Sequence, residues 1–247
     1  MKVILDKKTQ QLTVLDERFY TQDNTVFYPS VTTVLQSYPK GSFFEQWLMD
    51  TGRNAESIKR EAGIKGTNVH NAIEQYLKGF EIRLINDDGS ENYTFEEWKM
   101  IVRFMNFFSY EGIDRDDIEI EAMGFSNTLK VGGTIDLVVN IDGERWMIDH
   151  KTSNALHKTY KIQLAVYKTV WEEQNPGKKI DRYGVLWLNA KTRTHRPPLS
   201  GKGWQLKEFT EDYNHDMKLY HSVRRIWDEE NPNYYPKNIQ MKNSFKL

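Results

Sequence analysis

The chain contains no cysteine, and this absence limits what it can be. Disulfide bonds, cysteine-ligated zinc sites and iron–sulfur clusters are excluded. The sequence also has no apolar run long enough to span a membrane, and its first six residues lack the apolar segment of a signal peptide. We therefore expect a soluble, intracellular (cytoplasmic) protein that makes no contact with a membrane.

Net charge is also nearly absent, with a formal value of −1 at pH 7. Residues 177–247 nevertheless hold 14 Lys and Arg against 8 Asp and Glu, so a nucleic-acid path would be a local basic stripe. A chain of 247 residues with 7 Trp, 13 Tyr and 12 Phe can bury a sizeable core. We expect one domain over residues 1–247, with a hairpin and helices in 1–110, a sheet core in 111–210, and a helix and tail in 211–247.

Residues 132–153 are the most informative stretch, and they are predicted to form a β-hairpin. Two β-rich runs flank Asp142-Gly143, a dipeptide suited to a two-residue type I′ turn. With this pair as the loop, the register places Asp136 opposite Asp149, and it places Thr134 opposite Lys151. The other side of the ribbon is expected to carry an apolar face for burial. Its residues are Ile135, Leu137, Val139, Trp146 and Ile148.

The predicted register brings like charges together. Two carboxylates about 5 Å apart repel by roughly 3 kcal/mol at an effective dielectric of ~20, and a proton or a divalent cation between them removes that cost. Lys151 projects from the same face as Asp149, so two acids and one ammonium would share a rigid sheet, as metal-assisted phosphodiester cleavage requires. The spacing alone is weak, because Asp6/Lys8, Glu97/Lys99 and Asp216/Lys218 also have it. A solvated surface hairpin is an equal alternative at this point.

The N-terminal half is expected to be mainly helical. A short antiparallel strand pair is predicted at 2–6 and 11–15, and helices are predicted at 43–61, 66–79 and 94–110, the second with Thr67 as its cap. Inward-facing residues are expected to be Phe44, Trp47, Leu48 and Ile58 on the first helix, His70, Ile73, Glu74 and Leu77 on the second, and Trp98, Ile101, Val102, Met105 and Phe108 on the third.

Two features of this half have competing interpretations. Ser30 is a good N-cap, and a helix start that exposes Ser30, Thr32 and Thr33 can bind phosphate, although an ordinary capped helix has the same sequence. His70 on an apolar helix face is usually a hydrogen-bonded core residue. It becomes a metal ligand only if carboxylates are brought to it, and the hairpin has two to offer.

The C-terminal half is expected to complete the sheet. A strand that starts at Ile118 should pair with the first hairpin strand and carry Glu121 as a third acid. A helix over 154–174 would hold Gln163 and Tyr167 on one face. A buried strand is predicted at 182–189, a basic loop at 191–198, a strand at 204–209, a helix at 212–230 and an irregular tail from 231. The core residues of the last helix are expected to be Met217, Tyr220, Val223 and Trp227.

In this order, the segments resemble the PD-(D/E)xK nuclease superfamily, in its RecB-like exonuclease branch. The matching pieces are Gly66-Thr-Asn-Val-His70 with Glu74, Glu121, Gly133-Thr-Ile-Asp136, Asp149-His-Lys151-Thr-Ser and Gln163-x-x-x-Tyr167. Residues 28–35 are similar to a segment near the start of mitochondrial genome maintenance exonucleases and related phage and bacterial nucleases. Two departures are Ile135 in place of the Pro of the superfamily name and Asp149 where many members have Glu.

The resemblance implies a role for each matching residue. Metal ligands would be His70, Asp136, Asp149 and the backbone carbonyl of His150. Lys151 would orient or deprotonate the attacking water, and Glu121 would lie near the metal, which makes the catalytic set Asp136, Asp149, Lys151 and Glu121. Residues expected to contact nucleic acid are Ser30, Thr32, Thr33, Thr152, Ser153, Gln163 and Tyr167.

The implied fold is α/β (α+β), with a restriction-endonuclease-like core in which helices flank a mixed sheet with a central antiparallel hairpin. The implied activity is that of a metal-dependent DNA exonuclease in repair, recombination or replication, acting on single strands or free ends, with unknown protein partners. Oxygen ligands suit Mg²⁺, and one imidazole shifts the balance toward Mn²⁺. A structure-specific endonuclease and a non-catalytic nucleic-acid-binding protein are the alternatives. No Walker-type loop is present, so the chain is not a helicase.

Overall fold

A computed structural model describes residues 3–6, 11–14, 17–21, 26–189 and 203–236. The chain begins with a four-stranded antiparallel sheet in the order β1 (Val3–Asp6), β2 (Gln11–Val14), β3 (Glu17–Tyr20) and β4 (Tyr28–Pro29). The predicted pairing of the first two strands is confirmed, with Val3 opposite Val14. Among the described residues, no helix has the length and apolar character needed to cross a membrane.

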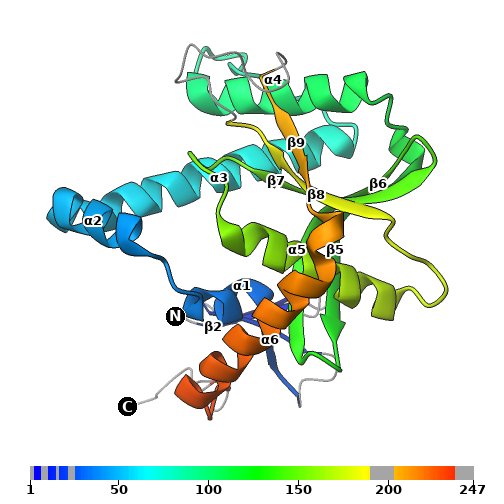
Figure 1. The fold of residues 1–247 in the computed structure, drawn as a ribbon. Coiled ribbons are helices and arrows are strands. Elements are labelled where there is room, and N and C mark those ends of the chain that lie inside the picture. The colour runs from blue at the N-terminus through cyan, green and yellow to red at the C-terminus, as the bar shows by residue number, and fades with distance from the viewer. Residues whose placement is uncertain (1–2, 7–10, 15–16, 22–25, 190–202, 237–247) are drawn as a thin grey trace, which may run out of the picture.

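The second sheet has five strands and forms the centre of the molecule (Figure 1). Its order is β5 (Ile118–Ser126), β6 (Val131–Ile141), β7 (Glu144–Lys151), β8 (Arg182–Trp187) and β9 (Gln205–Glu208). Only the β7–β8 pair is parallel, because α5 (Lys158–Gln174) carries the chain back between these two strands. The mixed sheet with a central antiparallel hairpin and flanking helices is the expected fold class.

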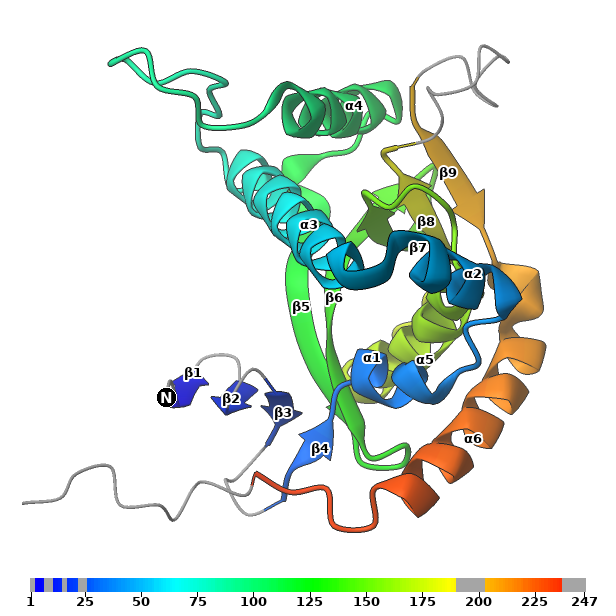
Figure 2. The ribbon, with the colours of Figure 1, turned by 90° about the vertical axis from the view of Figure 1, so that its left-hand side faces the viewer.

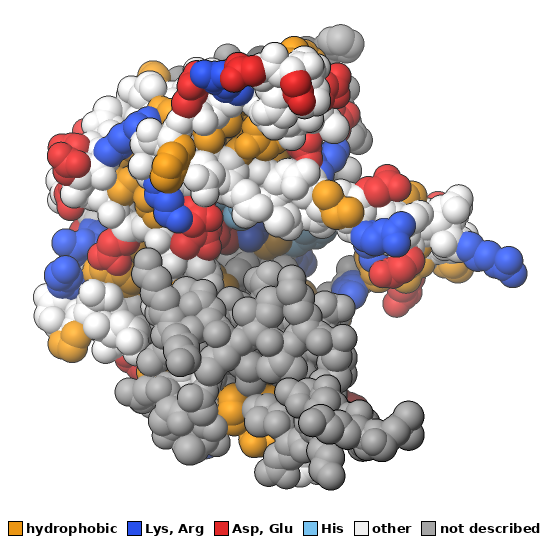
Figure 3. Space-filling view, turned by 180° about the vertical axis from the view of Figure 1, so that it is seen from behind, with side chains coloured by type: hydrophobic (Ala, Val, Ile, Leu, Met, Phe, Trp, Pro, Cys, Tyr) orange, Lys and Arg blue, Asp and Glu red, His pale blue; other side chains and the backbone are white. Residues whose placement is uncertain are grey.

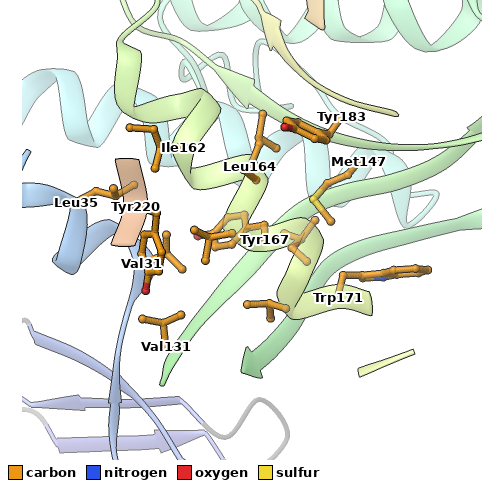
Figure 4. Packing of buried hydrophobic residues seen from close by; sticks show 14 of the residues in the cluster. Val31, Leu35, Val131, Met147, Ile162, Leu164, Tyr167, Trp171, Tyr183 and Tyr220 are labelled. Atoms are coloured by element: carbon orange, nitrogen blue, oxygen red, sulfur yellow. The ribbon is translucent and has the colours of Figure 1, made fainter. Parts of the chain in front are cut away.

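Helices cover both faces of this sheet (Figures 1 and 2). One face packs against α1 (Val31–Val34), α5 and α6 (Tyr213–Glu230), and the side chains of this core are shown in Figure 4. The other face packs against α3 (Ala55–Leu77) and α4 (Phe95–Tyr110). Short 3₁₀ segments complete the chain: η1 (Leu35–Ser37), η2 (Gly52–Asn54), η3 (Arg115–Asp117) and η4 (Thr210–Asp212). The hairpin β6–β7 is therefore buried on both of its faces.

The helix boundaries in the first half differ from the prediction. The first predicted helix breaks at Gly52, which has a φ of 57°, so α2 (Ser42–Thr51) ends there and α3 runs unbroken from residue 55 to 77. Thr67 is not a cap, since it lies inside α3 and its hydroxyl donates to the carbonyl of Gly63. Interior glycines such as Gly63 and Gly66 cost only about 1 kcal/mol each, which tertiary packing outweighs.

The expected inward face of the first predicted helix is also wrong. No described residue of α2 is buried, and Ile58 at the start of α3 is 44% exposed. Phe44, Trp47 and Leu48 are half-buried, and the rings of Phe44 and Trp47 contact each other. Figure 1 shows the reason, because α2 and the start of α3 project from the body of the molecule. In Figure 3 this projection carries mixed charged and hydrophobic side chains.

The buried face of α4 is wider than predicted. A capping box between Thr94 and Glu97 starts this helix. Trp98, Val102 and Met105 are only half-buried, while Ile101 and Phe108 are buried as expected. Burial also extends to residues that the sequence pattern missed, because α4 packs in one core with α3 and the sheet; they are Met100, Phe104 and Phe107.

The remaining elements follow the prediction with shorter bounds. Helix α5 begins at residue 158 and not 154, and strands β8 and β9 lie inside their predicted ranges. On α6, Tyr220, Val223 and Trp227 are buried as expected, and Met217 is half-buried. The basic loop predicted at 191–198 lies outside the described residues, as does the tail after residue 236.

Candidate active site

The turn of the hairpin has the predicted geometry. Asp142 and Gly143 both have positive φ, 53° and 83°, as a type I′ turn requires. The strand pairs run from Ile141–Glu144 to Leu137–Ile148, which confirms the predicted register. At the next step of that register, beyond the last backbone pair, stand Asp136 and Asp149.

A third acid lies at the same level on the neighbouring strand. Strand β5 pairs Ile120 with Leu137 and Ala122 with Ile135, so Glu121 stands beside Asp136 without forming a backbone pair with it. Glu121 has a φ of 49°, a left-handed conformation that is rare for a residue with a side chain. The acids of three adjacent strands therefore lie in one row where regular pairing is interrupted.

This irregularity overturns one expected contact. Ile135 was expected to share a face with Leu137, but it packs in the cluster of Val138 and Met147 under α5. Leu137 packs on the opposite face, toward α3 and α4. The alternation of side chains is thus broken next to Asp136, which lets this acid meet groups from the α3 side.

Asp136 is 9% exposed and is surrounded by nitrogen atoms. Its Oδ2 accepts a hydrogen bond from the backbone N–H of His150 at 3.0 Å. The same oxygen lies 3.7 Å from Nδ1 of His70 and 3.5 Å from Nδ1 of His150. Burial raises the pKa of Asp136, but the neighbouring His150, His70 and Lys151 outweigh it and hold this pKa below its ordinary value. Asp136 is therefore ionised at neutral pH.

Asp149 is paired with the lysine of the motif. The Nζ atom of Lys151 lies 2.8 Å from Oδ1 and 2.7 Å from Oδ2 of Asp149. Burial raises the pKa of Asp149 to about 6, against the attraction of Lys151 and with added repulsion from Asp136. Burial lowers the pKa of Lys151, but attraction by the two acids outweighs burial and the pKa is raised overall. Lys151 is thus a fixed positive charge, and its ammonium lies 5.0 Å from the ring centre of Tyr160.

Glu121 is the acid of the row that most readily holds a proton. Burial raises its pKa to about 7, and repulsion from Asp136 and Glu74 adds to this effect, while Lys78 opposes it. Glu74 and Lys78 lie one turn apart on α3 and form an ion pair with each other. The row therefore carries less than its full negative charge at neutral pH, since two of its members have a raised pKa.

The rings of the two histidines, His70 and His150, contact each other beside the acid row. Their ring centres are 4.0 Å apart with an interplanar angle of 34°. His150 is 2% exposed, and burial lowers its pKa to about 3, so its imidazole is neutral. Ligand atoms of His70, Asp136 and His150 all lie within 4.8 Å of one another, a separation that a shared metal ion permits. Figure 3 shows histidine surface in a recess with charged side chains beside it.

The residues predicted to contact DNA fall into two groups. Ser30 is the buried N-cap of α1; its hydroxyl accepts from the backbone N–H of Thr33 and contacts the hydroxyls of Thr32 and Thr33. Gln163 and Tyr167 are buried in the core and joined by a 3.0 Å hydrogen bond from Nε2 to the tyrosine hydroxyl. These four contacts are all made within the protein, and contact of these residues with nucleic acid stays a prediction.

Thr152 and Ser153 are the second group, and both are half-buried directly after β7. The Ser153 hydroxyl donates to the carbonyl of Ala155. The Thr152 hydroxyl lies close enough to Gly66 of α3 that an added Cβ there would be 3.4 Å from it. This pair therefore lies where the lysine strand meets the helix that carries His70, and its contact with nucleic acid stays a prediction.

Sequence reasoning missed Tyr160 and two close contacts made by glycines near the site. Tyr160 precedes Gln163 and Tyr167 by three and seven positions, so the helical period itself places it on their face. A Cβ on Gly133 would lie 2.3 Å from Cε1 of Tyr167, and one on Gly132 would lie 2.3 Å from Cγ of Tyr20. No signal in the sequence pointed to these two close contacts, because their partners are distant along the chain.

Fold and site together bring an acid row and a lysine onto a central hairpin, with a histidine-bearing helix beside it. The chain matches the family model of the PD-(D/E)XK nuclease superfamily over residues 43–233. This match covers most of the chain, and the protein therefore belongs to that superfamily. No curated protein sequence matches the chain.

Two solved structures are more distantly similar. A crystal structure from Eubacterium rectale, of a protein provisionally named an exonuclease, has 16% identity and a TM-score of 0.42, with 74% of this chain and 77% of that chain covered. The structure of Can2 from Sulfobacillus thermosulfidooxidans in complex with cyclic tetra-adenylate has 11% identity and a TM-score of 0.24, with 89% and 69% covered. At these scores neither bears on the activity of this chain.

Proposed function

We propose that this protein is a divalent-metal-dependent DNA exonuclease that hydrolyses phosphodiester bonds of single strands or strands with free ends. The observation that carries this proposal is the ion pair of buried Asp149 and half-buried Lys151 next to Asp136. An ammonium fixed by one acid, beside a second acid and a histidine, has no role in packing a core, where unpaired charges are costly. Membership of a nuclease superfamily supports the same conclusion.

The charge state of Lys151 defines its part in the reaction. Since its pKa is raised, the ammonium keeps its proton at neutral pH and is a poor base. A fixed positive charge at this place stabilises the negative charge that develops on an attacked phosphate and orients the attacking water. Asp149 and the ring of Tyr160 hold the ammonium in position. We therefore favour orientation and charge stabilisation over deprotonation of the water.

His70, Asp136 and Asp149 would hold a metal ion. The donor set fits a cation, because a carboxylate oxygen of Asp136 lies within 4.8 Å of ligand nitrogens of His70 and His150, and because Asp136 repels the neighbouring Asp149 when no cation is bound. When bound, Mg²⁺ or Mn²⁺ would activate water and neutralise phosphate charge. Glu121, with a pKa of about 7, can exchange a proton near this point at neutral pH.

DNA is the partner that this site implies. We propose that residues 1–247 form one nuclease domain and that Thr152 and Ser153 contact the strand at the end of β7. The other residues predicted to contact DNA would contribute indirectly, by positioning α1 and α5. They are Ser30, Thr32, Thr33, Gln163 and Tyr167.

The proposal is tested with end-labelled single-stranded DNA and Mg²⁺ or Mn²⁺. We expect cleavage by the wild type and none by the double variant Asp149→Ala/Lys151→Ala. The matched control is Lys99→Ala, which removes an exposed lysine of the same Glu-x-Lys spacing and should leave cleavage unchanged. Equal cleavage by the double variant would contradict the proposal. Circular single-stranded DNA separates the two modes of cutting, because an exonuclease leaves circles intact and an endonuclease opens them.

A further inference from the structure

His150 presents a buried side chain with an unusual lack of partners. Neither ring nitrogen forms a hydrogen bond with any of the described residues, although the side chain is almost fully enclosed. A buried polar group without a partner costs about 1–3 kcal/mol, and native proteins seldom leave one so. Its ring is held in place by Phe104, whose ring centre lies 5.6 Å away, and by the tilted ring of His70. A fixed, enclosed and unpartnered imidazole suggests a ligand.

One of these two nitrogens, Nδ1 of His150, lies close to a carboxylate oxygen of Asp136. Nδ1 of His150 lies 3.5 Å from Oδ2 of Asp136, and Nδ1 of His70 lies 3.7 Å from the same oxygen. Donors that bind one ion at about 2.1 Å are about 3.0–3.5 Å apart when they are neighbours in its coordination shell. The observed separations are close to that range, so small rotations would let all three atoms reach one ion.

We infer that the imidazole of His150 is itself a ligand of the metal, and that the site therefore selects a first-row transition ion such as Mn²⁺ over Mg²⁺. The superfamily resemblance assigned only the backbone carbonyl of His150 to the metal, in which case replacing the side chain would not change metal binding. Two imidazoles and a carboxylate favour transition ions, whereas Mg²⁺ prefers oxygen ligands and keeps its waters. The inference deepens the proposed function, on which it rests for the role of the bound ion.

Calorimetric titration of the metal-free protein with Mn²⁺ and, separately, Mg²⁺ tests the inference. The variant His150→Phe keeps an aromatic ring against Phe104 and His70 but removes both nitrogens. We expect wild type to bind Mn²⁺ at least 10-fold more tightly than Mg²⁺, and His150→Phe to lose about 10–100-fold in Mn²⁺ affinity while Mg²⁺ affinity changes less than threefold. The matched control is His215→Phe, which changes an exposed histidine of α6 and should leave both affinities unaltered.

Unchanged Mn²⁺ binding by His150→Phe, or equal losses for both ions, would overturn the inference. If His150→Phe does not fold, as judged by circular dichroism, pulsed electron paramagnetic resonance of Mn²⁺ on the wild type decides. Two coupled histidine nitrogens support the inference, and one overturns it. DNA cleavage is measured apart from binding. Cleavage with no Mn²⁺ preference and no dependence on His150 would contradict this inference but not the proposed function. Mn²⁺ binding that depends on His150, without cleavage of any DNA, would contradict the proposed function but not this inference.

Discussion

The two ends of the β6–β7 hairpin are built on opposite principles. At the turn end, backbone pairs follow one another without interruption from Ile141–Glu144 to Leu137–Ile148, and apolar side chains are buried on both faces. At the other end, pairing stops and charged groups are enclosed: Asp136, Asp149 and Lys151. The paired turn end stabilises the two strands, and at the site end the same strands hold the charged side chains in position.

The comparison shows where electrostatic cost is concentrated. The apolar half gains about 25 cal/mol for each Å² of apolar surface that it buries. The site half instead holds acids whose pKa values are raised, to about 6 at Asp149 and to about 7 at Glu121, because burial and mutual repulsion disfavour their charged forms. Under the proposed function, such a centre would be less stable empty than filled, and this difference would contribute to its affinity for a cation.

The largest effect is expected at the site end. Asp136→Ala, Asp149→Ala and Lys151→Ala should each lower the turnover of single-stranded DNA by about 10³-fold or more, since each removes a charge that faces the reacting phosphate. Thermal unfolding should remain a single transition within a few degrees of the wild type. Asp149→Asn keeps the shape of the side chain, so it should weaken Mn²⁺ binding in calorimetry and leave the fold intact. A variant of this set with wild-type turnover would show that the site end is not catalytic.

A smaller effect, on stability, is expected at Gly133, where β6 packs against Tyr167 of α5. Gly133→Ala should destabilise the protein by about 3 kcal/mol, because the new Cβ would lie 2.3 Å from Cε1 of Tyr167 and the two cannot overlap. Urea unfolding measures this change. The matched control is Gly63→Ala, which meets no atom within 4 Å inside α3 and should stabilise the protein by about 0.5–1 kcal/mol. The same sign for both substitutions would contradict the close contact of Tyr167 with β6.

The turn end could be predicted from the sequence, and the site end only in part. Residues close together in the sequence determine the turn end, since Asp142-Gly143 favours one turn type and the alternating apolar pattern then fixes the strand register. That register aligned Asp136 with Asp149. It did not predict that Lys151 binds Asp149 through both carboxylate oxygens, or that the ring of His150 contacts that of His70. The first contact depends on side-chain rotamers set by the surrounding packing, and the second joins segments 80 residues apart, so only tertiary packing determines them.

The errors have the same physical origin. The helical period predicted buried positions on α2, but period alone does not say whether a partner covers the apolar face, and here α2 projects from the body. The predicted face of Ile135 was wrong because strict alternation along β6 was assumed through Asp136, beside which the backbone of Glu121 on β5 is left-handed. A local irregularity of this kind is typical of functional sites, where strain is retained because the chemistry needs it.

The pH dependence of stability separates the two ends further. Glu121 has an ordinary pKa of 4.5, raised to about 7 in the folded protein, so the folded state binds more protons between these values. Stability should therefore fall as pH rises from about 4.5 to 7 and then level off. Glu121→Gln removes this loss and should make the metal-free protein more stable than wild type by about 2 kcal/mol at pH 8, after discounting for solvent screening.

Urea unfolding at pH 5 and at pH 8, in the presence of a chelator, measures the difference. The control Glu229→Gln changes an exposed acid of α6 and should shift both curves little. A gain for Glu121→Gln that is equal at the two pH values would mean that the acid row does not carry the expected repulsion.

The smallest effect is expected at the turn itself. Gly143 has a φ of 83°, and an added Cβ would meet no atom within 4 Å, so Gly143→Ala costs only backbone strain of about 1 kcal/mol. The melting temperature should fall by about 2–4 °C. Turnover per folded molecule and Mn²⁺ affinity should not change, because the pairs between the turn and Asp136 transmit no shift of register. If Gly143→Ala lowered Mn²⁺ affinity without unfolding the protein, the two ends would be coupled, and the division of labour along the hairpin would not hold.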